Sequence, residues 1–292
     1  MSETVNYLFR AKTKENDAFV VKILSELLSN VVKWAPFTVN ERGISLNQRD
    51  ERNEQWLEIL LNKDDFHVFK CAKPIHFLVN SSTFYKMLKT IKKKDTITIF
   101  ITEAEPLRLG ITVEQATEKN KITTYIKISY NRPEDIQLGA DTLNEYKGPL
   151  IISSKEFQKM KILHPISPEI KLTSNNNQLK FSCDAGELVE RELVINTEED
   201  GEGENLPNNY VQTYNTQTIT QLTKCAGQSG NTVHLFIQRD LPLKIKMRAG
   251  NLGELIIYIK SKEMLEYEAE EEANEESQDE NGSDSSDETN EK

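Results

Sequence analysis

The chain repeats itself at a spacing of 133 to 136 residues, and this repeat limits the possible folds more than any other feature of the sequence. Four segments of the first half recur in the same order in the second: NSSTFYKMLKTI (80–91) as NTQTITQLTKCA (215–226), TITIFI (96–101) as TVHLFI (232–237), PLRL (106–109) as PLKI (242–245), and YIK (125–127) as YIK (258–260). Repeats that stack into solenoids are only about 20–50 residues long. The longer period therefore indicates a duplicated domain.

Each copy is predicted to contain a helix, strands, a second helix and further strands. Apolar residues at helical spacing predict a helix over residues 17–32. Its counterpart begins with Ser153 and Glu156, which form a capping-box pattern. Asn80 and Asn215 are typical N-caps of the second helix in each copy. Alternating or apolar runs predict strands at 37–46, 56–61, 66–71, 122–130 and 186–196.

These elements predict an α+β protein built from two helix-plus-antiparallel-sheet domains. The first domain is expected over residues 1–132 and the second over residues 148–265. Pro133 and Gly139 mark residues 133–147 as a connector between the two.

The chain has a net charge of −11, and this charge comes from its last segment. Residues 266–292 contain 13 acidic residues and one basic residue, whereas the rest of the chain has 35 basic and 34 acidic residues. A segment this charged and this poor in apolar residues is predicted to be disordered. We find no apolar run long enough for a membrane span and no signal peptide, so we expect an intracellular protein.

Lysines are concentrated on the four predicted helices of an otherwise nearly neutral body. Because they occur in both copies, they favour a sequence-independent phosphate-binding surface over the simple alternative that they solvate exposed helix faces. The lysines on these helices include Lys22, Lys86, Lys89, Lys159 and Lys224.

The sequence has no pattern typical of catalysis, of a metal site or of a cofactor. Cys71, Cys183 and Cys225 lack zinc-site spacing, and the four histidines are scattered. No phosphate-binding glycine loop is present either. We therefore expect a binding protein without catalytic residues, bound metal or cofactor.

Several segments, in order along the chain, match one known family: Gly43–Leu46, Phe69–Cys71, Lys86–Lys89, Leu138–Gly139, Glu145–Tyr146, Ser154–Phe157, Leu222–Ala226, Pro242–Leu243 and Leu255–Tyr258. They resemble proliferating cell nuclear antigen, the sliding clamp of eukaryotes and some viruses, and the resemblance runs from about residue 7 to residue 262. No single segment is decisive; the order and the duplication carry the resemblance.

The resemblance implies the DNA-clamp fold and a ring-forming homotrimer that encircles duplex DNA. The lysines that would then face DNA are Lys22, Lys86, Lys89, Lys159 and Lys224. Such a ring is opened by a clamp loader and tethers DNA polymerase and other replication and repair proteins as a processivity factor. It would act in the nucleus or, for a viral protein, at a cytoplasmic replication site. Partner peptides with apolar and aromatic anchors would bind beside the connector, in a groove formed by Trp56, Leu138, Tyr146, Pro242 and Tyr258.

The chain departs from this family at the groove and at its end. Arg49 and Asn53 stand where the family has methionine and histidine, and Lys260 and Ser261 replace an Ala-Pro pair. Two alternatives stay open. One is a clamp paralogue that acts in a DNA-damage checkpoint or in viral late transcription, and the other is a DNA-processing enzyme. Formation of a homotrimer would distinguish the replication clamp from both.

Overall fold

The computed structural model describes residues 6–117, 120–130, 146–175, 178–196, 207 and 209–282. The first half contains β1 (Tyr7–Lys12), α1 (Asp17–Val31), β2 (Trp34–Asn40), β3 (Gly43–Arg49), β4 (Gln55–Asn62), the 3-10 helix η1 (Lys63–Asp65), β5 (Val68–Cys71), β6 (Ile75–Asn80), α2 (Ser81–Leu88), β7 (Thr96–Thr102), β8 (Arg108–Glu114) and β9 (Lys121–Lys127). The second half contains β10 (Leu150–Ser153), α4 (Ser154–Gln158), the 3-10 helix η2 (Lys159–Ile162), β11 (Glu169–Asn175), β12 (Gln178–Asp184), β13 (Glu190–Asn196), β14 (Tyr210–Asn215), α5 (Thr216–Thr220), α6 (Thr223–Ala226), β15 (Thr232–Phe236), β16 (Leu243–Ala249), β17 (Gly253–Ile259) and α7 (Lys262–Gly282).

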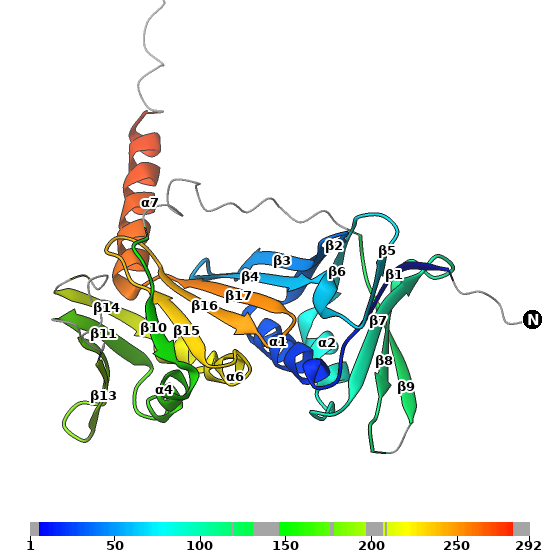
Figure 1. Ribbon diagram of the computed structural model, residues 1–292. Coiled ribbons are helices and arrows are strands. Elements are labelled where there is room, and N and C mark those ends of the chain that lie inside the picture. Colours follow the sequence, from blue (N-terminus) through cyan, green and yellow to red (C-terminus); the bar gives the residue numbers. More distant parts are fainter. Residues whose placement is uncertain are drawn as a thin grey trace, which may run out of the picture.

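Three antiparallel sheets form the protein, which confirms the predicted α+β class. An eight-stranded sheet, β10-β15-β16-β17-β4-β3-β2-β6, runs through both halves (Figure 1). The halves join where β17 pairs with β4, in a register from Gly253 opposite Leu61 to Ile259 opposite Gln55. A five-stranded sheet, β5-β1-β7-β8-β9, and a four-stranded sheet, β13-β12-β11-β14, complete the body.

Strand order shows the duplication directly. The run β1-β7-β8-β9 of the first half recurs as β10-β15-β16-β17, and the run β4-β3-β2-β6 recurs as β13-β12-β11-β14. The two halves therefore share one topology. Most of the predicted connector, residues 133–147, lies outside the described residues, and the domain boundaries stay predictions.

The predicted helix starts have the expected caps. The side chain of Asn80 accepts a hydrogen bond from Thr83 N at 2.9 Å, and Asn215 caps α5 in the same way. Ser153 and Glu156 form the capping box that starts α4. The helices of the second half are short, however, because α4 ends after Gln158 and continues as the 3-10 helix η2.

One predicted strand is wrong, because residues 37–46 form parts of two strands joined by a tight turn. Asn40 Oδ1 accepts a hydrogen bond from Arg42 N at 2.8 Å, and the chain reverses at Glu41 and Arg42. Gly43, the first residue of β3, has a φ of 147° and pairs with Asn40. A Cβ at this position would lie 1.9 Å from the carbonyl oxygen of Leu61, so only glycine allows β3 to lie so close to β4.

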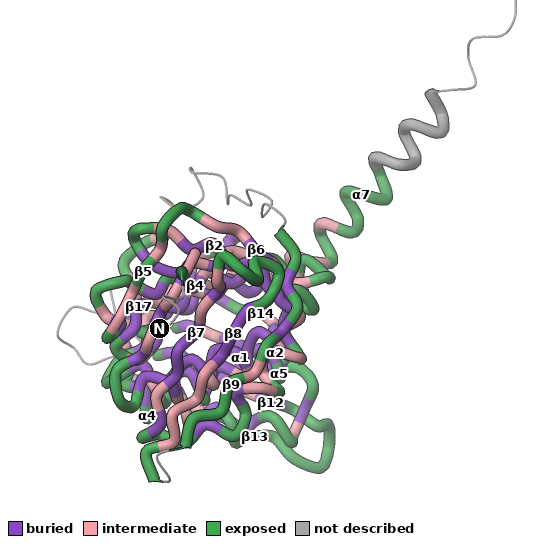
Figure 2. The backbone as a smooth tube through the Cα atoms, turned by 90° about the vertical axis from the view of Figure 1, so that its right-hand side faces the viewer, coloured by how far each residue is buried: buried purple, intermediate pink, exposed green. Residues whose placement is uncertain are grey.

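The helices cover the sheets on one side and thereby enclose the core. Along α1, the residues at helical spacing, such as Leu24, Leu27 and Leu28, are buried against the strands. Figure 2 shows this buried layer through the body, whereas α7 projects away from it and is largely exposed. No helix among the described residues is long and apolar enough to cross a membrane.

The prediction of a disordered segment from residue 266 is wrong for its first part, because α7 extends to Gly282. Glutamate and alanine are good helix formers, and specific contacts hold the first turn of α7. The carboxylate of Glu263 accepts hydrogen bonds from Thr213 N at 3.0 and 3.1 Å. Ser261 Oγ accepts one from Met264 N at 3.2 Å. Residues 283–292 lie outside the described residues.

Candidate functional sites

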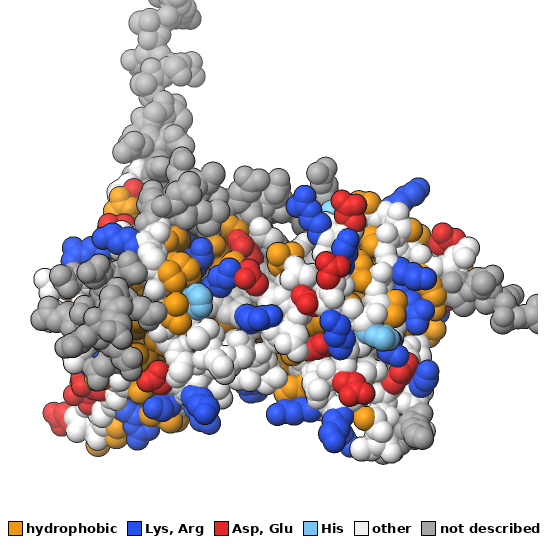
Figure 3. All heavy atoms as spheres, in the orientation of Figure 1, with side chains coloured by type: hydrophobic (Ala, Val, Ile, Leu, Met, Phe, Trp, Pro, Cys, Tyr) orange, Lys and Arg blue, Asp and Glu red, His pale blue; other side chains and the backbone are white. Residues whose placement is uncertain are grey.

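Helices α1, α2, α4 and α6 lie together on one face of the molecule, at the bottom of Figure 1, whereas α7 projects from the opposite side. α1 packs against α2 in the first half and against α6 of the second half, and α6 in turn packs against α4. In Figure 3, lysine and arginine side chains gather along this lower edge.

A broad hollow between the two groups of helices brings three of the five predicted DNA-facing lysines together. Lys22 on α1, Lys89 at the end of α2 and Lys224 on α6 all line it. Lys93 and Lys161, which the prediction left out, line it too. The other two predicted lysines, Lys86 on α2 and Lys159 on η2, lie on the same helices but do not line the hollow.

Two of these lysines, Lys22 and Lys224, already have partners inside the protein. Lys22 Nζ donates to the carbonyl oxygen of Ile91 at 3.0 Å and lies 5.1 Å from the ring centre of Phe19. Lys224 forms an ion pair with Glu26, whose side chain is only 20% exposed. A phosphate group would compete with these contacts, so the surface suits loose binding without base readout.

The predicted partner groove is built on an aromatic pair at the junction of the two halves. Trp56 on β4 lies opposite Tyr258 on β17, and the two rings stack with their centres 5.1 Å apart. The hydroxyl of Tyr146 donates to the carbonyl oxygen of Pro242 at 2.8 Å. The structure thus brings four of the five predicted groove residues together, whereas Leu138 lies outside the described residues.

Lys244 on β16 is a groove residue that the sequence analysis missed. Its ammonium lies over three rings, 5.2 Å from the centre of Tyr146, 4.7 Å from Phe236 and 5.4 Å from Tyr258. Burial lowers the pKa of Lys244, and the nearby carboxylate of Glu58 opposes that shift. The strand register explains why Lys244 reaches these rings, because Lys244 pairs directly with both Phe236 and Tyr258.

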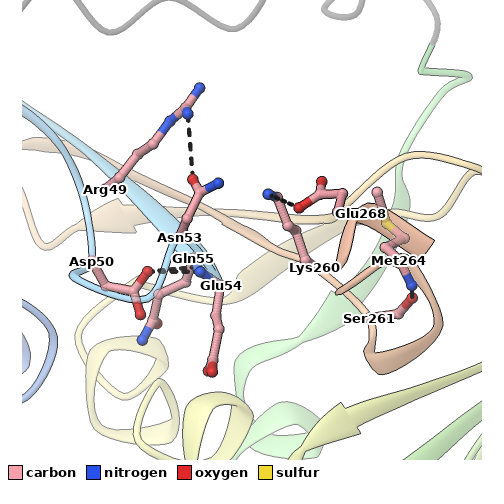
Figure 4. Close-up of polar contacts among 9 residues, drawn as sticks. All are labelled: Arg49, Asp50, Asn53, Glu54, Gln55, Lys260, Ser261, Met264 and Glu268. Atoms are coloured by element: carbon pink, nitrogen blue, oxygen red, sulfur yellow. Dashed lines mark hydrogen bonds and ion pairs between the residues drawn. The ribbon is translucent and has the colours of Figure 1, made fainter. Parts of the chain in front are cut away.

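Three of the four residues at which the chain departs from the family gather in one pocket beside these rings. Arg49, Asn53 and Lys260 line it together with Trp56, Pro242 and Tyr258. Figure 4 shows the polar contacts around it. Arg49 Nη1 donates to Asn53 Oδ1 at 3.3 Å, and its guanidinium lies 5.7 Å from the ring centre of Trp56. Lys260 pairs with Glu268 of α7 at 2.6 Å.

Two of the predicted strands, at residues 122–130 and 186–196, correspond to β9 and β13 and lie at open sheet edges. β9 ends the five-stranded sheet and β13 ends the four-stranded sheet. On β9, Ile122 is 53% exposed although its strand partner Val113 packs against the core. Leu255 stands at the equivalent position of β17 and is 0% exposed, because β4 lies beside it. The open edge therefore leaves an apolar residue uncovered.

Within the described residues, we find no cluster of three or more histidine, cysteine or acidic side chains that could hold a metal ion. Burial raises the pKa of Cys225 to about 12, with a further contribution from Glu26, so this thiol is neutral at physiological pH. These observations identify no nucleophile or metal centre in that part of the chain.

Together, these features resemble a clamp subunit: two halves of one topology joined through a continuous sheet, lysine-bearing helices on one side and an aromatic groove beside α7. Residues 8–131 match the family described as "Proliferating cell nuclear antigen, N-terminal domain". The chain is 25% identical over 255 residues to the "DNA polymerase sliding clamp" of Nitrosopumilus maritimus (strain SCM1), and the alignment covers 86% of this chain and 97% of the relative. It is 20% identical over 256 residues to the "Probable DNA polymerase sliding clamp 1" of Paramecium bursaria Chlorella virus 1, covering 86% and 95%. The chain is thus similar to sliding clamps of the proliferating-cell-nuclear-antigen type over most of its length.

Proposed function

We propose that this chain is the subunit of a ring that encircles duplex DNA and tethers DNA polymerase to it. The observation that carries the proposal is the pairing of β17 with β4, because it supplies a rule for joining one domain to the next. In the repeated topology, β9 is equivalent to β17 and β13 is equivalent to β4. β9 of one copy can therefore pair with β13 of the next copy in the way that β17 pairs with β4.

Head-to-tail pairing of this kind closes into a ring when the rotation between copies is right, and it removes both open edges. The clamp resemblance suggests three copies, and so a homotrimer. The equivalent contact inside the chain aligns seven residue pairs. A clamp loader would then have to open one such interface to admit DNA.

The lysine-lined helical face would lie toward the DNA in this ring. Because lysines bind phosphates without reading bases, the ring could slide along any sequence. The body is nearly neutral, so DNA would be held mainly by encirclement. We assign no catalytic residue, and location in the nucleus or at a viral replication site stays a prediction.

The proposal is tested by comparing retention on circular and linear DNA at moderate salt. Rings placed on circular DNA by a loader should persist, whereas rings on linear DNA should slide off its ends. Equal retention on both would refute encirclement.

A charge-reversal triple variant tests the helical face. Changing Lys86, Lys89 and Lys224 to glutamate should impair loading and polymerase processivity without breaking the ring. A matched control changes three exposed lysines that lie outside α1, α2, η2 and α6, namely Lys63, Lys70 and Lys73, to glutamate. Equal loss in both variants would indicate a general charge effect and contradict the assigned face.

A further inference from the structure

The C-terminal helix forms one wall of the pocket at the aromatic pair. Met264, Glu268 and Glu272 all line this pocket together with Trp56 and Tyr258. These three residues are four positions apart and therefore lie along one face of α7. A peptide bound on the aromatic pair would have this stripe of α7 beside it.

The wall is fixed in place at its base. Lys262 pairs with Glu169 of β11 at 2.8 Å, and Glu263 accepts two hydrogen bonds from the backbone nitrogen of Thr213 at the edge of β14. Lys260 pairs with Glu268 one turn further along. The direction in which α7 leaves the body is therefore set by contacts with the second half.

The charges of the pocket favour a cationic ligand. Four acidic side chains line it, but only two basic ones. Of the two basic ones, Lys260 is already paired with Glu268, and Arg49 stands across the pocket over Trp56. Among the described residues, no ion pair involves Glu272. The α7 wall therefore offers a carboxylate that a bound partner can neutralise.

We propose that the groove selects peptides that carry lysine or arginine next to their apolar anchors. This inference rests on the proposed role of the groove in binding clamp partners. The anchors would contact Trp56, Pro242 and Tyr258, while the basic side chain pairs with Glu272 and competes with Lys260 for Glu268. Nucleic acid does not fit this site, because its phosphates would lie against the carboxylates of α7.

Synthetic peptides test the proposal. Three fluorescent peptides share one set of aliphatic and aromatic anchors and are flanked on each side by two lysines, two serines or two glutamates. Anisotropy titrations against the full-length protein should give the tightest binding with lysine flanks and the weakest with glutamate flanks. Two partly exposed ion pairs predict a difference of about five- to tenfold between lysine and serine flanks, and this difference should shrink at high salt.

A matched pair of variants assigns the effect to the stripe. Glu268→Lys with Glu272→Lys should abolish the preference for lysine flanks. Glu266→Lys with Glu270→Lys changes the total charge equally but on the opposite face of α7, so the preference should persist. The neutral pair Glu268→Gln with Glu272→Gln gives the same test if the lysine variant unfolds, and circular dichroism checks each fold.

Different results would overturn this inference and the proposed function on which it rests. Equal loss in the stripe variant and the opposite-face variant, or tighter binding of glutamate flanks, would overturn the selection for basic partners while leaving the groove intact. A different pair of results would show that the groove itself is misplaced: the serine-flanked peptide fails to bind, and Trp56→Ala does not change the affinity for the lysine-flanked peptide. In that case the partner-binding part of the proposed function fails as well.

Discussion

Ile122→Lys should open the proposed ring without unfolding the subunit. Ile122 faces the core side of β9 but is 53% exposed, because no strand covers that edge. A lysine here can extend into solvent in the free subunit. In the ring, the same position would lie under β13 of the next copy, as Leu255 lies beside β4. Natural proteins often place lysine on sheet edges to prevent such pairing.

The size of the effect follows from the exposed fraction. Full burial of an isoleucine side chain contributes about 1.5–3 kcal/mol, so covering the exposed half of Ile122 contributes roughly 1 kcal/mol per interface. Placing an ammonium group in the contact costs about a further 1–2 kcal/mol in desolvation or displacement. The total of about 2–3 kcal/mol corresponds to roughly 30- to 150-fold weaker association at each interface.

Sedimentation velocity over a concentration series measures this loss. The control is Leu60→Lys, because Leu60 is 45% exposed on β4 in the interior of the large sheet and lies opposite Glu254. We expect Ile122→Lys to sediment as a monomer at concentrations where the unchanged protein and Leu60→Lys are trimeric. Unchanged assembly of Ile122→Lys, or a monomeric unchanged protein, would refute the pairing of β9 with β13.

Two further predictions concern the half-buried Lys244 and the buried Cys225. Lys244→Met should weaken binding of a polymerase tail peptide about 5- to 30-fold, because the ammonium over Tyr146, Phe236 and Tyr258 contributes about 1–2 kcal/mol to holding the groove rings together. Fluorescence anisotropy measures this loss, and unchanged affinity would count against the role of Lys244. Burial raises the pKa of Cys225 to about 12, so the thiol stays protonated at pH 8 and iodoacetamide should modify it only after the protein unfolds. Mass spectrometry detects the modification, and rapid modification of the folded protein would contradict the burial of Cys225.

The sequence by itself determined the duplication and much of the local structure. The repeat at about 133 residues predicted two halves of one topology, and the caps at Asn80, Ser153 and Asn215 lie at the predicted helix starts. These features depend on short-range hydrogen bonds and on side-chain periodicity, which are written into neighbouring residues. The family resemblance added the aromatic groove, of which four of five predicted residues come together.

Only the tertiary structure decided which strands join the two halves and which side chains meet. The sequence cannot show that β17 pairs with β4, because strand pairing depends on contacts about 200 residues apart. From the sequence, Lys244 was identified only as part of a repeated segment. In the structure, its ammonium lies over three rings from three separate segments. The acidic end was predicted to be disordered from its own composition. Its first turns are helical because Thr213 and Glu169, far away in the sequence, supply the partners that hold them.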